Sequence, residues 1–208
     1  MHTDWTRLAL PGDLGAVWEL YAEVTADMAG TTEDVGWEMG AHPSRAQLDR
    51  AVADRTLLIA TPSDAADVTD ASESPSAASG RSTQAAPFVP STPEPPSVLG
   101  AVIVDTAAPE GYAGVPWRVD AGPGEAGVIH LLAVSPRARG RGVARRLLDA
   151  AAELAAERGM RALRLDVFPN ASHAARVYTS LGFVDLGLHT ITYTTCDNTT
   201  FRLFEREL

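Results

Sequence analysis

An apolar strand, a glycine-rich turn and a long helix follow one another without interruption in this chain, and this succession limits its possible folds more than any other feature. Residues 128–134 have the apolar composition of a strand, and residues 135–140 are predicted to form the turn. Residues 142–158 carry apolar side chains along one stripe and stop at Gly159, as an amphipathic helix does. A second predicted strand follows at 161–168, and this order indicates that the two strands are parallel neighbours.

The turn has the features of a site for an anion. The first backbone N–H groups of a helix have no partner within the helix and carry partial positive charge, which suits a pyrophosphate. Gly140 and Gly142 allow the backbone to approach phosphate oxygens closely, and the small side chain of Ala144 leaves room in the first helical turn. The net charge of the chain is −10, yet five of its 17 basic residues lie between Arg137 and Arg146. Positive charge gathered at one place in an acidic chain predicts a bound anion.

The basic residues, all of which are arginine, exclude several classes of phosphate-binding and cofactor-dependent protein. All 17 are Arg, and the absence of Lys rules out a Walker-type phosphate loop and a pyridoxal enzyme with a Lys Schiff base. A dinucleotide site of the Rossmann type would have Gly or Ala at the position of Arg145. The Arg run can also be interpreted as a solvated surface or an RNA-binding patch, although the net negative charge argues against general nucleic-acid binding. We therefore expect no nucleic-acid partner.

Shorter elements surround this unit. The remaining predicted elements are a helix that starts at 11–13, a helix capped by Ser44, a short helix at 172–180, and strands at 5–10, 56–60, 98–105, 184–193 and 200–207. The strands at 56–60 and 98–105 are expected to pair as a hairpin with a greatly lengthened turn. The expected fold is of the α/β (α+β) class, with a mixed, mostly antiparallel sheet of six to seven strands and helices on both faces.

Two stretches interrupt the predicted elements. Residues 61–97 are rich in Ser, Ala and Pro and poor in large apolar side chains, so we expect a disordered insertion there. A linker between two domains is the alternative, but the 60 residues before it offer little core of their own. We therefore expect residues 1–208 to form a single interrupted domain, in which the role of the insertion is open. A second insertion at 107–127, rich in Gly and Pro, carries Tyr112 and Trp117.

The sequence also bears on location and covalent chemistry. It contains no apolar run long enough to cross a bilayer and no recognisable signal peptide, so we expect a cytoplasmic protein without a membrane partner. Cys196 is the only cysteine, which excludes an internal disulfide and a cysteine-based metal cluster. His173 and His189 lack the spacing of metal ligands, so no metal is expected. The oligomeric state is open, with a homodimer as one possibility.

The segment around the turn resembles motif A of the GCN5-related N-acetyltransferases (GNAT), in which an Arg or Gln is followed after two residues by Gly, and then by Gly or Ala two positions later. Here these residues are Arg139, Gly142 and Ala144. Downstream, the stretch from Arg164 to Asp166 and the helix end with Tyr178, Leu181, Gly182 and Phe183 are also similar to the family. The resemblance implies a GNAT-like fold whose two central parallel strands splay apart, and acetyl-CoA as co-substrate.

The resemblance also implies which residues bind the coenzyme. The pantetheine arm would lie between the two splayed strands, and the backbone of the turn would hold the pyrophosphate. The residues implied are Leu132, Ala133 and Val134 for the arm, and Arg139, Gly140, Arg141, Gly142, Val143 and Ala144 for the phosphates. The family often has Asn seven residues before the Tyr, where this chain has Ala171. Asn170, one residue earlier, either reaches the coenzyme or caps the following helix.

Two residues are candidates for catalysis. Tyr178 occupies the position at which the family places a Tyr whose hydroxyl meets the coenzyme sulfur, and a phenol is a suitable proton donor to a thiolate. His130 belongs to the strand beside the expected acetyl group, and strict alternation would put it on the same face as Val128 and Leu132. Its imidazole can take a proton from an amine directly or through water. Glu125 and water alone are alternative bases, and His130 is alternatively a hydrogen-bonded core residue.

The sequence therefore predicts an acyltransferase that moves an acetyl group from acetyl-CoA to an amine by direct attack in a ternary complex. A non-catalytic domain that binds or senses acyl-CoA is the alternative, since it would keep the turn without needing an acid and a base. The acceptor is open: it could be a protein N-terminus, a Lys side chain, a polyamine or another small amine.

Overall fold

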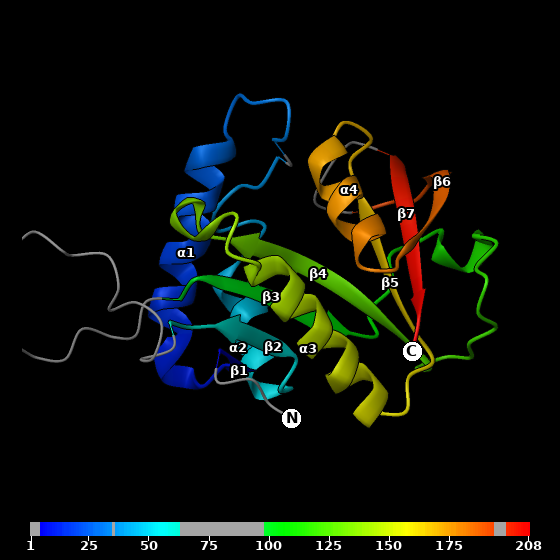
Figure 1. The fold of residues 1–208 in the computed structure, drawn as a ribbon, viewed down its shortest axis with the longest axis horizontal. Coiled ribbons are helices and arrows are strands. Elements are labelled where there is room, and N and C mark those ends of the chain that lie inside the picture. Colours follow the sequence, from blue (N-terminus) through cyan, green and yellow to red (C-terminus); the bar gives the residue numbers. More distant parts are fainter. Residues whose placement is uncertain (1–4, 35, 63–97, 194–198) are drawn as a thin grey trace, which may run out of the picture.

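The computed structural model describes residues 5–34, 36–62, 98–193 and 199–208. Residues 63–97 of the predicted disordered insertion at 61–97 lie outside these ranges, and so does Cys196. Seven strands form one sheet in the order β1-β2-β3-β4-β5-β7-β6 (Figure 1). Every neighbouring pair is antiparallel except β4 and β5, which are parallel. The predicted mixed, mostly antiparallel sheet is confirmed.

The first half of the chain supplies three strands at one side of the sheet and two helices. These elements are β1 (Thr6–Leu8), α1 (Leu14–Met28), α2 (Arg45–Ala53), β2 (Leu57–Ala60) and β3 (Gly100–Asp105). Ser44 caps α2 as predicted, since its hydroxyl accepts the N–H of Gln47 at 3.2 Å. β2 and β3 pair as the predicted antiparallel hairpin, whose strand ends lie opposite each other.

The second half supplies the parallel strands and the remaining helices. These elements are β4 (Ala126–Val134), α3 (Val143–Glu157), β5 (Ala162–Val167), α4 (Ser172–Ser180), β6 (Val184–Thr190) and β7 (Thr200–Glu207). Three short 3-10 turns complete the fold: η1 (Pro11–Asp13), η2 (Tyr112–Gly114) and η3 (Pro136–Ala138). The predicted strand at 184–193 is shorter than expected, because pairing of β6 with β7 ends at Thr190.

Helices cover both faces of the sheet. The apolar side chains of α3 pack with Tyr178 of α4, and with Leu181 directly after that helix, against one face. Those of α1 and α2 pack against the other, where Val17 and Leu48 are buried. In Figure 1, α3 crosses in front of the strands. Because each helix has one apolar stripe, this three-layer arrangement buries all four stripes against a single sheet.

The two parallel strands separate halfway along their length. They pair only from Ala126 with Ala162 to Val128 with Arg164. Beyond Val128, β4 keeps β3 as its partner on one edge, and the strands diverge visibly in Figure 1. The other edge of β4 therefore has backbone groups that no strand of the described chain pairs with. This is the splay that the resemblance implied.

A β-bulge in β4 changes the direction of its side chains. The pairing of β3 with β4 shifts by one residue between Ala101 and Ile103, and Leu131 has a φ of +52°. Ile129 and Leu132 consequently both pack on the α3 face, although they are three positions apart. The prediction that His130 shares a face with Leu132 is wrong, because the extra residue reverses the alternation between them.

The Gly- and Pro-rich stretch before β4 is anchored to the sheet by a buried ion pair. Glu205 of β7 accepts the N–H groups of Arg118 and Val119 at 2.7 and 3.1 Å. It also accepts Nε of Arg164 at 3.0 Å, and that guanidinium lies 4.3 Å from the ring centre of Trp117. The side chain of Glu205 is 1% exposed. This second insertion is therefore fastened to the sheet at Arg118 and Val119.

Within the described ranges, no helix is both long and apolar enough to cross a membrane.

Candidate active site

A cavity of about 990 Å³ opens where β4 and β5 diverge. Its walls come from α1, the α1–α2 loop, β4, the turn before α3 with the first turn of that helix, β5, α4, and the chain around Tyr193 and Phe201 of β7. Most of the predicted site residues line it together: His130, Leu132, Ala133, Val134, Arg139, Gly140, Gly142, Val143, Ala144 and Tyr178. The structure thus brings the predicted phosphate turn and the predicted catalytic residues to one continuous space.

The turn before α3 presents backbone N–H groups to this cavity. Gly140 and Gly142 have φ values of +76° and +78°, in the left-handed region that favours glycine. Helical hydrogen bonding begins with the N–H of Arg146, which donates to the carbonyl of Gly142. For the N–H groups of Gly142, Val143 and Ala144, no acceptor is found among the described residues. Three adjacent donors at a helix N-terminus form an arrangement that fits a diphosphate.

Two arginines of the turn are already paired with α1. Arg139 lies 2.6 Å from a carboxylate oxygen of Asp27, and Arg137 lies 3.0 Å from one of Glu23. The hydroxyl of Ser135 also donates to Glu23, at 2.9 Å. These contacts fasten the turn to α1. Arg139 therefore faces the cavity with part of its charge neutralised by Asp27.

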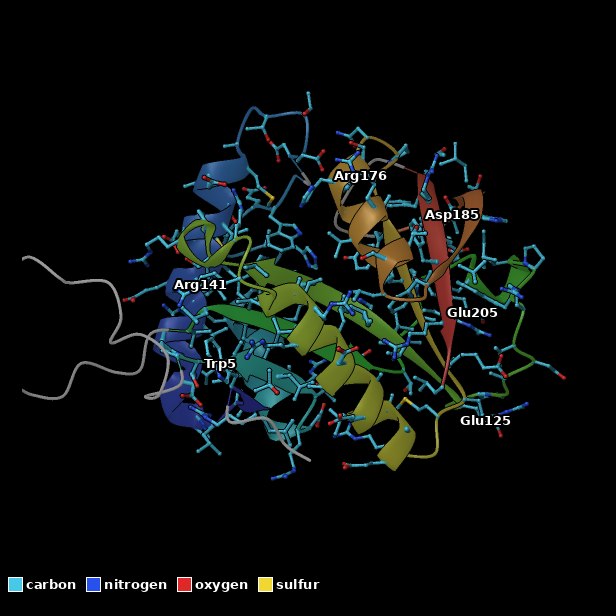
Figure 2. The ribbon with its side chains drawn as sticks, in the orientation of Figure 1. Trp5, Glu125, Arg141, Arg176, Asp185 and Glu205 are labelled. Carbon is cyan, nitrogen blue, oxygen red and sulfur yellow. The ribbon has the colours of Figure 1, made fainter. Side chains whose placement is uncertain are left out.

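Sequence reasoning missed Arg145 as a candidate for phosphate binding. Its side chain is exposed and lines the cavity in the first turn of α3. A signal was present in the sequence, because Arg145 occupies the position at which a dinucleotide fold would need a small residue. Arg141, in contrast, is exposed and lies outside the cavity lining, beside the same turn (Figure 2).

Tyr178 projects from α4 into the buried end of the cavity. Its ring packs on Phe183 and Phe204, with centroid distances of 5.8 and 5.7 Å. Burial, and then the charge of Asp166, raise the pKa of its phenol well above the ordinary value. Among the described residues, none forms a hydrogen bond with its hydroxyl. Tyr178 is thus a protonated phenol, and its O–H is available to a ligand.

His130 is held by two acceptors near the start of the bulge. Its Nε2 lies 3.0 Å from the carbonyl oxygen of Ala107 and 3.2 Å from a carboxylate oxygen of Asp105. Because both partners accept, Nε2 carries the proton and Nδ1 is the nitrogen left to accept one. Burial acts to raise the pKa of Asp105, but the hydrogen bond and charge of His130 and the N–H of Ala107 lower it overall. His130 is therefore an oriented imidazole in the cavity wall.

Two other candidates lie elsewhere. Glu125 is outside the cavity lining, directly before β4 (Figure 2), where its carboxylate accepts the N–H of Gly122 at 2.9 Å. The side-chain amide of Asn170 donates to the carbonyl of Thr32 in the α1–α2 loop at 2.6 Å. Asn170 is not a lining residue, and its side chain does not cap α4. It ties that loop to the start of α4 instead.

A partly buried carboxylate that the sequence analysis assigned no role occupies the cavity wall. Asp166 of β5 accepts the hydroxyl groups of Tyr112 at 2.6 Å and Tyr193 at 2.7 Å, both on Oδ1. Burial raises its pKa, although both phenol hydrogen bonds and the charge of His130 oppose that rise. Only the alternation of β5 pointed to it, since Asp166 follows Arg164 by two residues on a strand that is otherwise apolar.

Within the described residues, no group of three or more His, Cys, Asp or Glu side chains is placed to hold a metal ion.

The turn, the splayed strands and the buried tyrosine are the features that the resemblance to the GNAT family implied. The model of the acetyltransferase (GNAT) family matches residues 75–183, which is more than half of the chain. The protein belongs to this family and is an N-acetyltransferase that uses acetyl-CoA. No curated protein sequence matches the chain significantly.

Solved structures with the same fold are numerous and distant in sequence. A GNAT-family acetyltransferase from Streptococcus agalactiae has a TM-score of 0.67 at 16% identity, over 98% of this chain and 94% of its own. An acetyltransferase from Salmonella typhimurium, solved with its cofactor acetyl-CoA, has a TM-score of 0.57 at 14% identity, over 100% of this chain and 95% of its own. A GCN5-related N-acetyltransferase from Kribbella flavida has a TM-score of 0.55 at 16% identity, over 98% and 96%. At these identities the likeness shows the fold.

Proposed function

We propose that the protein transfers an acetyl group from acetyl-CoA directly to an amine while both substrates occupy the cavity. The observation that carries this proposal is the continuity of the cavity, which joins the unpaired N–H groups before α3 to Tyr178 and His130. The described lining residues include neither a thiol nor a lysine amine that could hold the acetyl group between two steps. A ternary complex with direct attack fits this arrangement.

The coenzyme would extend along the divergence of the strands. The N–H groups of Gly142, Val143 and Ala144 suit its diphosphate, with Arg139, Gly140, Arg141 and Arg145 adding positive charge and donors at the turn. The edge of β4 at Leu132, Ala133 and Val134 has lost β5 as a neighbour, so its backbone groups are available to the amides of the pantetheine arm. Asn170 is bonded to Thr32 and takes no part in this proposal.

The two catalytic candidates divide the proton transfers between them. Acetyl-CoA supplies a thioester carbonyl, which the amine attacks as the thiolate departs. The Tyr178 hydroxyl, kept protonated by burial, donates its proton to the departing sulfur. His130 accepts a proton from the amine at Nδ1, directly or through water, since its Nε2–H is engaged by Ala107 and Asp105. The position of Glu125 outside the cavity speaks against it as the base.

The proposal extends to the setting of the reaction. One chain supplies every group named above, so the chemistry requires no second copy and no metal. Acetyl-CoA is an intracellular metabolite, and we accordingly propose a cytoplasmic location.

The experiment that tests the proposal has two stages. Calorimetry with acetyl-CoA measures coenzyme binding, and a thiol-release assay over a panel of amines then measures transfer. We expect saturable binding and turnover that depends on the amine. Binding without turnover of any amine would instead indicate an acyl-CoA sensor. Salt-sensitive RNA binding that acetyl-CoA does not displace would indicate that the Arg cluster serves another purpose.

A further inference from the structure

One wall of the cavity combines aromatic rings with a carboxylate. Tyr193 donates to Asp166 at 2.7 Å, and its ring centre lies 5.4 Å from that of Phe201. Phe201 in turn lies 5.1 Å from Phe168. All four residues line the cavity, so three touching rings and one carboxylate form a continuous surface. We call this surface, made of Asp166, Phe168, Tyr193 and Phe201, the acceptor wall.

Among the residues that the structure describes, no arginine pairs with the carboxylate of the acceptor wall. Both hydroxyl donors to Asp166 bind Oδ1, and no described residue donates a hydrogen bond to Oδ2. Arg164, two positions earlier on β5, is bonded to Glu205 instead. The arginines that line the cavity, Arg139 and Arg145, both belong to the turn before α3 or its first residues. A carboxylate oxygen in the cavity wall is thus left to interact with a ligand.

The groups proposed for catalysis lie close to this carboxylate. Asp166, His130 and Tyr178 line the same cavity, and the charge of Asp166 contributes to the raised pKa of the Tyr178 phenol. An amine held by Asp166 would therefore be near both the proton acceptor and the proton donor. A ring attached to that amine would find the aromatic part of the same wall.

We propose that the acceptor is an amine with an aromatic or apolar body and no anionic group, and that Asp166 selects it. This inference rests on the proposed function and names its substrate class. Asp166 Oδ2 attracts the ammonium form, and the attached body packs on Phe168, Tyr193 and Phe201. The ammonium first releases one proton to solvent. The neutral amine then attacks, and the N–C bond forms as the C–S bond breaks. His130 Nδ1 takes the second proton from the nitrogen, the sulfur takes the Tyr178 proton, and exchange with solvent returns both side chains to their starting protonation. An amino acid brings a carboxylate next to Asp166, where like charges repel in a partly buried site.

The test compares pairs of acceptors that differ by one carboxylate. With acetyl-CoA at saturation, thiol release gives kcat/KM for 2-phenylethylamine against phenylalanine and for tryptamine against tryptophan. We expect kcat/KM for each amine to exceed that for its amino acid by about 100-fold, because like-charge contacts in such sites cost several kcal/mol. Equal values for the two members of each pair would overturn the inference and leave the proposed function intact. If no amine of any class is acetylated, the proposed function itself fails.

A variant identifies the residue responsible. Asp166→Asn keeps the shape and an oxygen for the two phenols but removes the charge. We expect the preference for the amine over the amino acid to fall at least tenfold, while the dissociation constant for acetyl-CoA stays within about twofold. Asp185→Asn is the control, since Asp185 is exposed, pairs with Arg202 at 3.0 Å and lies away from the cavity on β6 (Figure 2). An unchanged preference in Asp166→Asn would contradict the role of Asp166, and the comparison in the unaltered protein does not depend on how the variant folds.

Discussion

Some polar side chains around the cavity already have a hydrogen-bond or ion-pair partner within the protein, and others do not. Arg139 is paired with Asp27, and Asn170 is bonded to the α1–α2 loop. The Tyr178 hydroxyl and Asp166 Oδ2, in contrast, have no hydrogen-bond partner among the described residues. Partly buried polar atoms without a protein partner are costly unless a ligand or water satisfies them, so these atoms are the ones expected to interact with substrates.

Replacing Tyr178 with Phe tests the proposed proton donor. The ring packing on Phe183 and Phe204 would remain, and only the hydroxyl would be lost. We expect kcat to fall about 100-fold, the lower end of what a positioned acid contributes, with little change in the dissociation constant for acetyl-CoA. Steady-state kinetics and calorimetry measure the two quantities. A variant with unaltered kcat would remove Tyr178 from the mechanism.

Replacing Arg145 with Gln tests the exposed cation at the start of α3. A charge-assisted contact to a phosphate at the surface contributes about 1 kcal/mol, so we expect acetyl-CoA to bind roughly fivefold more weakly, with a smaller dependence on salt. Arg176→Gln is the matched control, because Arg176 is exposed on α4 and outside the cavity lining (Figure 2). Equal affinities of the two variants would argue against a phosphate contact by Arg145.

At the scale of elements, the site is a consequence of how β4 ends its pairing. The loss of β5 beyond Val128 opens the cavity, and the bulge at Leu131 turns His130 away from the face that Leu132 occupies. The turn that follows β4 then places the N-terminus of α3 at the edge of the same cavity. Strand, bulge, turn and helix start thus act as one contiguous unit of the chain.

Replacing Gly142 with Glu tests the anion site at this helix start. The new residue would adopt a φ near +78° and add a carboxylate beside the expected diphosphate. The new carboxylate would repel the diphosphate, and the strained turn would no longer hold its N–H groups in place. Together these effects should weaken acetyl-CoA binding by at least about 100-fold. Gly159→Glu is the control, since Gly159 has a φ of +77° beyond the other end of α3 and carries a similar backbone strain of about 1–2 kcal/mol. Undiminished coenzyme affinity in Gly142→Glu would contradict the assignment of the turn.

Replacing Glu205 with Gln tests the ion pair that joins β5, β7 and the loop before β4. The variant leaves Arg164, whose side chain is 11% exposed, without its carboxylate. Removing one partner of a buried pair is expected to lower the free energy of unfolding by about 3 kcal/mol. Chemical denaturation measures the change. Glu125→Gln is the control, because Glu125 and Arg161 are half exposed and 3.8 Å apart, and a similar loss in both variants would contradict the importance of burial.

At the scale of the whole molecule, two halves of the chain build one sheet around the cavity. The first half supplies β1 to β3 with α1 and α2, and the second half supplies the remaining strands with α3 and α4. The hairpin of β2 and β3 belongs to the first half, and its two strand ends are adjacent, since the N–H of Leu99 donates to the carbonyl of Ala60 at 2.8 Å. Two adjacent strand ends can be joined by a short turn.

A deletion tests the expectation of a single interrupted domain. Replacing residues 63–97 with a four-residue Gly- and Ser-containing turn should leave the sheet able to form, because the strand ends already meet. Each halving of loop length lowers the entropic cost of closure by about 0.6 kcal/mol, so the thermal midpoint should stay equal or rise. Thermal unfolding and acetyl-CoA binding measure the outcome. Loss of the folded state would show that the segment contributes to the domain.

The sequence alone was sufficient for the class of fold and for the strand, turn and helix start on which the predicted phosphate site lies. Both depend on patterns that are local in the chain: the period of apolar residues, the glycines that permit positive φ, and the order of strand, turn and helix. The ten predicted residues that line the cavity include most of this turn and the adjacent strand. Neighbours in sequence remain neighbours in space, and their spacing therefore predicts their geometry.

The tertiary structure decided which side chains meet and which are already occupied. Asp166 accepts hydrogen bonds from Tyr112 and Tyr193, which are 54 and 27 residues away in sequence, and no local pattern predicts such a contact. The bulge in β4 reverses an alternation that the sequence suggests, because its position depends on pairing with β3. These features follow from long-range packing and register, where the energy of a contact depends on residues that the local sequence does not contain.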